Sequence, residues 1–152
     1  MGQRVSPTNE IHFENCKVSA NALLGELNDG YKVAMTELAG GRIGIGALAL
    51  GIGLAAMDMA SRYSLERKQF GKVISQFQGI QWKLADCYTA LEAGRLLLMN
   101  AAFQKEQGRP FSKAASMAKL HCTEAANVAC YEAMQIFGGY GYMRDYPVEK
   151  YM

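Results

Sequence analysis

Apolar residues recur at steps of three and four along most of the chain after Gly30, which is the spacing of a helix with one buried face. The first such run predicts one long helix from about Gly30 to Gln69, ending near Gly71, because a glycine allows the chain to turn. The apolar positions expected to face the core from this helix are Ile45, Leu48, Ile52, Ala55, Met59 and Tyr63.

The same spacing predicts two further helices. One begins near Phe77 and stops at residues 108–110, where Gly-Arg-Pro interrupts the pattern. The next begins at Ser112, a residue type that caps helix N-termini, and ends at Gly138 and Gly139. Long helices joined by short turns predict an all-α fold, an antiparallel helical bundle.

Both ends of the chain depart from this pattern. Between Glu10 and Val18 apolar and polar residues alternate imperfectly, which indicates a short N-terminal β segment followed by a bend. Near the other end, Asp145 and Pro147 are typical of a helix start, yet barely one turn could follow them. We therefore expect the sequence to stop inside an element and to be a fragment.

The first helix is unusually rich in glycine, and each glycine costs roughly 1 kcal/mol relative to alanine inside a helix. Small residues at positions 40, 44, 47, 51 and 55 share one face, where they would let another backbone approach closely. Two loose matches to the dinucleotide-binding glycine pattern occur in this helix, at 44–49 and 51–56. That interpretation is rejected because the pattern must follow a buried strand.

Composition excludes several classes of protein. The net charge is only +2 and no basic stripe interleaved with aromatics is present, so nucleic acid is not an expected partner. The four cysteines are scattered and form no Cys-x-x-Cys unit, which indicates reduced thiols and an intracellular compartment. The apolar run from Ile43 to Ala60 is broken by glycines and contains Asp58, so we expect neither a signal peptide nor stable membrane insertion.

Three short motifs could carry chemistry. Residues 65–71 (Leu-Glu-Arg-Lys-Gln-Phe-Gly) combine cations, an aromatic and a turn, which suits an anion clamp, but cations also favour a helix C-terminus through its dipole. Residues 135–142 (Gln-Ile-Phe-Gly-Gly-Tyr-Gly-Tyr) could leave backbone amides open to a ligand, or could be only a glycine cap and a turn. Arg42, preceded by Gly40 and Gly41 inside the glycine-rich helix, either reaches solvent or meets an anionic partner. His12 and His121 have no partners at metal-ligand spacing, so no metal site is predicted.

Together, four motifs in register resemble the acyl-CoA dehydrogenase family. They are residues 30–35 (Gly-Tyr-Lys-Val-Ala-Met), 41–46 (Gly-Arg-Ile-Gly-Ile-Gly), 66–71 (Glu-Arg-Lys-Gln-Phe-Gly) and 135–142, continued by Tyr-Pro-Val-Glu-Lys at 146–150. The resemblance implies that residues 1–28 are the end of a middle β domain with its linker, and that residues 29–152 are an incomplete C-terminal helical bundle domain.

The resemblance also implies a cofactor, FAD, and the residues that would contact it. The position matching Arg67 reaches the FAD of a neighbouring subunit, and so does the stretch that matches residues 135–139. The implied FAD contacts are Arg67, Phe70, Phe77, Gln78, Gln135, Gly138 and Gly139. Arg42 matches an arginine near the acyl-CoA substrate.

The family reaction introduces a double bond between the α and β carbons of an acyl-CoA thioester, which needs a carboxylate base with a raised pKa. In most members this glutamate is expected beyond residue 152, and the alternative position before Arg42 holds Gly41, so no catalytic residue is assigned. Implied partners are acyl-CoA, an electron-transfer flavoprotein as acceptor, and further subunits of a homodimer or homotetramer. The implied compartment is the bacterial cytoplasm or the mitochondrial matrix.

Two alternatives remain from the sequence. One is a non-catalytic helical interaction module that keeps the fold but binds neither flavin nor thioester. The other is an acyl-CoA oxidase or desulfinase-like offshoot of the same family.

Overall fold

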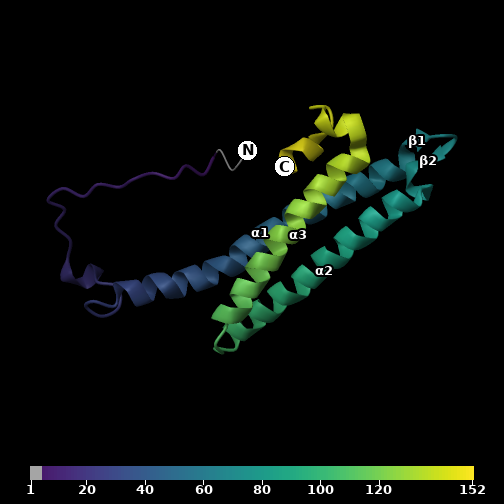
Figure 1. Cartoon of the computed structure of the whole chain (residues 1–152). Coiled ribbons are helices and arrows are strands. Elements are labelled where there is room, and N and C mark those ends of the chain that lie inside the picture. The colour runs from purple at the N-terminus through teal and green to yellow at the C-terminus, as the bar shows by residue number, and fades with distance from the viewer. Residues whose placement is uncertain (1–4) are drawn as a thin grey trace. The chain divides into compact units, whose positions relative to one another are not determined.

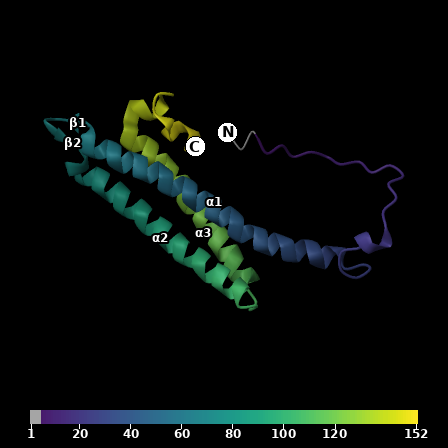
Figure 2. The same ribbon diagram turned by 180° about the vertical axis from the view of Figure 1, so that it is seen from behind.

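The computed structural model describes residues 5–152 and is dominated by three helices, α1 (Gly30–Glu66), α2 (Gln78–Glu106) and α3 (Ser112–Phe137). Two compact units divide the chain between Glu37 and Leu38. The prediction of an all-α helical bundle is confirmed for the second unit, where α2 runs antiparallel to both the following α3 and the preceding part of α1 (Figures 1 and 2).

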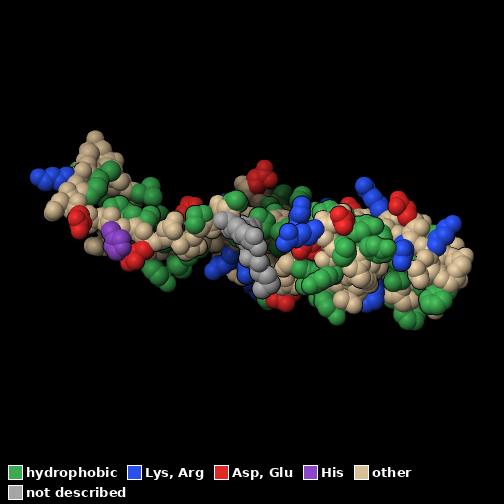
Figure 3. All heavy atoms as spheres, turned by 90° about the horizontal axis from the view of Figure 1, so that it is seen from above, with side chains coloured by type: hydrophobic (Ala, Val, Ile, Leu, Met, Phe, Trp, Pro, Cys, Tyr) green, Lys and Arg blue, Asp and Glu red, His purple; other side chains and the backbone are tan. Residues whose placement is uncertain are grey.

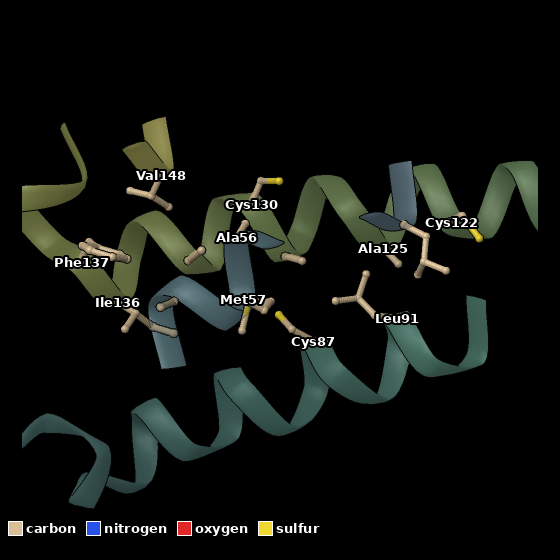
Figure 4. Close-up of a cluster of buried hydrophobic side chains, with 14 of the residues drawn as sticks. Ala56, Met57, Cys87, Leu91, Cys122, Ala125, Cys130, Ile136, Phe137 and Val148 are labelled. Atoms are coloured by element: carbon tan, nitrogen blue, oxygen red, sulfur yellow. The ribbon is translucent and has the colours of Figure 1, made fainter. Parts of the chain in front are cut away.

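The core of this bundle is built from small and medium-sized side chains on all three helices. Met57 and Leu91 are fully buried, and alanines and cysteines fill the space around them (Figure 4). The remaining members of the main buried cluster are Leu50, Ala56, Ala60, Ile74, Cys87, Cys122, Ala125, Ala129, Cys130, Ala133, Ile136, Phe137 and Val148. Burial raises the pKa of the thiols of Cys87, Cys122 and Cys130, so these core cysteines are poor nucleophiles.

Small residues do bring the helices close together, but on a different face of α1 from the predicted one. A Cβ atom on Gly53 would lie 3.1 Å from the Cα of Ala126 and 2.8 Å from Leu91 Cδ2, whereas Gly44 and Gly51 have open space beside them. The predicted core stripe is confirmed only in part: Ile52, Met59 and Tyr63 pack against the core cluster, whereas Ile45 and Leu48 are nearly half exposed. The reason is that α1 is apolar on more than one face, so spacing alone did not identify the buried one.

The first helix ends three residues before the predicted position. After Glu66 the chain forms a two-stranded hairpin, β1 (Lys68–Gln69) with β2 (Lys72–Val73), in which Lys68 pairs with Val73. Phe70 and Gly71 form the turn with φ values of 52° and 80°, the left-handed conformation that a two-residue hairpin loop requires. A short 3₁₀ helix, η2 (Ile74–Gln76), leads into α2.

The other helix ends lie close to the predicted ones. The helix α2 ends just before Gly108, whose φ of 64° allows the turn into α3. Ser112 is the first residue of α3 rather than its cap, because Phe111 occupies the cap position and makes no side-chain cap hydrogen bond. At its C-terminus, α3 stops at Gly138 with φ 58°.

The C-terminal segment folds back onto the bundle as two 3₁₀ helices, η3 (Gly138–Tyr142) and η4 (Pro147–Tyr151). A helix start at Pro147 was predicted, but the element is 3₁₀ and its cap residue is Tyr146, not Asp145. Val148 is fully buried in the core cluster, which anchors this segment.

The first unit contains a short 3₁₀ helix, η1 (Ala20–Ala22), and the beginning of α1. The β segment predicted between Glu10 and Val18 is not formed as a strand; the residues are irregular, with a bend at residues 14–15. Ile11, Phe13 and Val18 are each more than 70% exposed. A strand needs hydrogen bonds to a neighbouring strand, and no described segment supplies them.

By length and composition, α1 is the one helix among residues 5–152 that could cross a membrane. Core helices pass the same test. Its small residues pack onto α2 and α3 at Gly46, Gly53 and Ala56, as those of a core helix do.

Candidate functional site

A cavity of about 780 Å³ opens where the end of α1, the hairpin, the start of α2 and the end of α3 meet. This volume is within the range of small-molecule and cofactor pockets. Its walls are mainly apolar and aromatic, with two cationic side chains and three glycines. The lining residues are Tyr63, Arg67, Gln69, Phe70, Ile74, Phe77, Gly79, Ile80, Lys83, Ile136, Phe137, Gly138, Gly139, Tyr140 and Met143.

Arg67 brings a positive charge to the pocket directly after the end of α1. Its guanidinium carbon lies 5.0 Å from the centre of the Tyr140 ring, and within residues 5–152 it forms no ion pair with a carboxylate. Its charge is therefore free to meet an anionic ligand. A planar guanidinium matches the oxygens of a phosphate.

An aromatic cluster supports the ring beneath Arg67. Tyr63 stacks on Phe137 with ring centres 4.2 Å apart, and Tyr146 packs edge-on against Tyr140 at 5.3 Å. Burial raises the pKa of the Tyr63 hydroxyl, and the charge of Arg67 opposes that shift. The cluster connects α1, α3 and the C-terminal segment, and so fixes one wall of the pocket.

Phe70 stands at the tip of the hairpin in an unusual state. It is 92% exposed although apolar, and it adopts a positive φ, which is costly for a bulky side chain. Its ring meets Phe77 edge-on at 6.2 Å, and the Lys72 ammonium lies 4.4 Å from the Phe77 ring centre. An exposed aromatic held at this cost is what a stacking contact to a bound ring would explain.

The two glycines after α3 leave backbone accessible at the pocket. A Cβ atom on Gly138 or Gly139 would meet no other atom within 4 Å, so the space above them is open. The positive φ of Gly138 also favours glycine at that position. A ligand can therefore approach the main chain closely here.

Lys83 is the second cation of the pocket, and it is already paired. Its ammonium group donates a hydrogen bond to Glu132 Oε2 on α3, in a partly buried pair. The pKa of the Cys87 thiol is raised mainly by burial, and the negative charge of Glu132 is the second largest cause. Among the described lining residues none is an aspartate, glutamate or histidine, so the pocket lining supplies no carboxylate or imidazole base.

The structure brings together five of the seven predicted cofactor contacts. Arg67, Phe70, Phe77, Gly138 and Gly139 all line the cavity.

The other predicted residues lie elsewhere. Gln78 and Gln135 are exposed and are not part of the lining. Arg42 is half-buried and lies in α1, about 37 Å along the helix from Arg67 at 1.5 Å per residue, so any role it has belongs to a different site.

Sequence reasoning missed Tyr63 and Lys83. Tyr63 was assigned to the core stripe of α1, and nothing in the sequence showed that its ring also faces a pocket. A lysine on a helix usually belongs to a solvated face, and only its position three residues after Ile80, on the apolar side of α2, could have indicated otherwise.

Residues 28–152 match the family model described as "Acyl-CoA dehydrogenase, C-terminal domain". Acryloyl-CoA reductase (NADH) of Anaerotignum propionicum is 48% identical over 150 residues, which cover 99% of this chain and 38% of that protein. The structure of butyryl-CoA dehydrogenase from Megasphaera elsdenii superposes with a TM-score of 0.90 at 48% identity, covering 92% of this chain and 37% of that one. A chain in a structure of the electron transferring flavoprotein of Acidaminococcus fermentans gives a TM-score of 0.89 at 50% identity, with 92% and 37% covered. The chain thus spans less than two fifths of these relatives.

Proposed function

The chain belongs to the acyl-CoA dehydrogenase family, and from that premise we propose that it is the FAD-contacting helical part of an enzyme that oxidises an acyl-CoA thioester. In this proposal residues 1–28 belong to a preceding β domain and residues 29–152 to the helical domain. The observation that carries the proposal is Arg67, a cation without a carboxylate partner in the described chain, in an aromatic pocket beside two open glycines.

The chemistry of the pocket lining suits FAD. The phosphates would be held by Arg67, whose charge is supported by the Tyr140 ring. Phe70 and Phe77 would pack against a planar ring of the cofactor, and the open backbone at Gly138 and Gly139 would let it lie close to the chain. Gln78 and Gln135 would contact the cofactor only from outside the cavity.

Bound flavin would supply the hydride acceptor for α,β-dehydrogenation. The contribution of this chain is to bind and orient the cofactor and to exclude water from its apolar walls. The proton-abstracting carboxylate would come from outside the pocket described above. Arg42 is proposed to contact the acyl-CoA at its separate place on α1.

The partners follow from the family and from one relative. We propose an electron-transfer flavoprotein as the electron acceptor, in line with the similarity to a chain in a structure of such a flavoprotein. A homodimer or homotetramer is proposed because the family places the pocket against the FAD of a neighbouring subunit. The compartment would be the bacterial cytoplasm or the mitochondrial matrix.

The test is the loss of flavin after removal of the Arg67 charge. In the complete protein that contains this chain, Arg67→Ala should release FAD roughly 10- to 100-fold faster on dilution, because a charge-assisted hydrogen bond contributes about 1.5–3 kcal/mol. FAD retention is followed by visible absorbance after gel filtration. Arg95→Ala is the matched control, since Arg95 pairs with Glu92 on the exposed side of α2.

A wild-type protein that purifies without flavin and takes up none would contradict the proposal and favour the interaction module. Equal FAD retention by wild-type and Arg67→Ala protein would contradict the role of Arg67. Bleaching of the bound flavin on addition of an acyl-CoA would support the oxidation step.

A further inference from the structure

The two cations of the pocket are in opposite electrostatic states. Arg67 meets only the face of an aromatic ring, so its positive charge is uncompensated in the described chain. Lys83 is hydrogen-bonded to Glu132, and the two side chains are only 36% and 21% exposed. Charges so placed are screened less by water and salt than surface charges are.

The pair bridges two helices at the pocket wall. Lys83 belongs to α2 and lines the cavity, whereas Glu132 belongs to α3 and is not itself part of the lining. The Glu132 carboxylate thus neutralises Lys83 without itself lining the cavity. As long as the pair is intact, Lys83 adds no net charge to the α2 wall of the pocket.

We propose that Glu132 is a specificity-determining residue of this pocket, which acts by neutralising Lys83 so that a dinucleotide ligand places its phosphates at Arg67 and an uncharged ring at the α2 wall. The inference rests on the proposed FAD-binding function and adds the orientation of the ligand. It differs from a simple structural bridge between α2 and α3. A structural bridge is lost whichever partner is removed, whereas charge balance gives effects of opposite sign.

The direction of the change in FAD release follows from the charge that remains in each single variant. Glu132→Gln leaves the Lys83 ammonium unpaired at the pocket, which attracts phosphate and should slow FAD release. Lys83→Gln leaves the Glu132 carboxylate uncompensated behind the wall, which repels phosphate and should speed FAD release. The double variant removes both charges and should return close to the wild-type rate.

The experiment measures FAD release from the complete protein for the wild type, the two single variants and the double variant. We expect release about threefold slower for Glu132→Gln and about threefold faster for Lys83→Gln, as for a partly exposed ion pair. Both differences should shrink when the salt concentration is raised. Thermal unfolding of each variant shows whether it is folded, and if Lys83→Gln does not fold, the direction for Glu132→Gln decides alone.

Faster release from both single variants would overturn the inference, because it would identify the pair as a bridge only. Unchanged release in both would overturn it as well. Arg67→Ala, measured alongside, distinguishes failure of this inference from failure of the proposed function. If the Arg67→Ala protein loses FAD but the Glu132 and Lys83 variants do not change the release rate in opposite directions, only this inference is wrong. If the wild-type protein holds no FAD, the proposed function and this inference are both wrong.

Discussion

At the scale of single residues, Arg67 is held in its pocket by an aromatic ring and not by a carboxylate. An ion pair would have neutralised the guanidinium, whereas the face of Tyr140 positions it at 5.0 Å and leaves its charge available. Tyr140 is itself packed against Tyr146 and Tyr63. The pocket thus holds Arg67 in place through the Tyr140 ring while leaving its positive charge unneutralised.

This arrangement makes Tyr140 a positioning residue, and the ring should matter more than the hydroxyl. Tyr140→Leu should weaken FAD binding by about 0.5–1 kcal/mol, the usual magnitude of a cation–π contact at an accessible site, while Tyr140→Phe should bind almost normally. Titration of the apoprotein with FAD measures the difference. Tyr142→Leu is the control, because Tyr142 is 84% exposed and does not line the cavity; equal losses in the Phe and Leu variants would contradict the role of the ring.

At the scale of elements, the close packing of α1 depends on particular glycines and not on glycine content. Gly53 faces the Ala126 backbone and Leu91, and Gly46 lies against Lys119 of α3, while Gly51 faces open space. Gly51 and Gly53 are only two residues apart on the same helix. Their alanine variants should therefore have opposite effects on stability.

Gly53→Ala should lower the free energy of unfolding by about 1–3 kcal/mol, because the added methyl group meets backbone that cannot yield easily. Gly51→Ala should raise it by about 0.5–1 kcal/mol, because alanine has the better helix propensity and no neighbour lies within 4 Å. Urea unfolding followed by circular dichroism measures both. Destabilisation of similar size at the two positions would show that the contact at Gly53 is not the cause.

At the scale of the whole molecule, the second unit exposes many large apolar side chains that take no part in its core. Hydrophobic side chains lie among the charged ones over the helical surface (Figure 3). On α3, residues spaced at helical steps form an outer stripe, and the members more than half exposed are Leu120, Val128 and Tyr131. Such a stripe is consistent with the proposed homo-oligomer.

A charge on this stripe should separate the subunits. Val128→Glu is expected to shift the complete protein toward smaller species, because burying an unpaired carboxylate at an interface is costly. Light scattering coupled to gel filtration measures the mass, and far-ultraviolet circular dichroism checks the helix content. Gln107→Glu, at the exposed turn after α2, adds the same charge as a control; an unchanged mass for Val128→Glu would exclude the α3 stripe from the interface.

The family resemblance determined which parts of the site could be predicted. Arg67, Phe70 and Gly138 belong to short motifs whose residue types left both a ligand site and an ordinary helix end open, and only the four motifs in register selected them as cofactor contacts. Lys83 and Glu132 lie 49 residues apart and meet only across two packed helices. No local pattern could have indicated that pair.

The sequence by itself determined the three helices, their approximate ends and their antiparallel order, because helical periodicity, glycine and proline act over a few residues. Tertiary structure decided which face of α1 is buried, since its apolar residues are spread over several faces and only contact with α2 and α3 selects Gly46 and Gly53. It also decided that the hairpin and the end of α3 enclose one pocket. Distances between segments far apart in sequence are set by packing, which no single stretch of sequence contains.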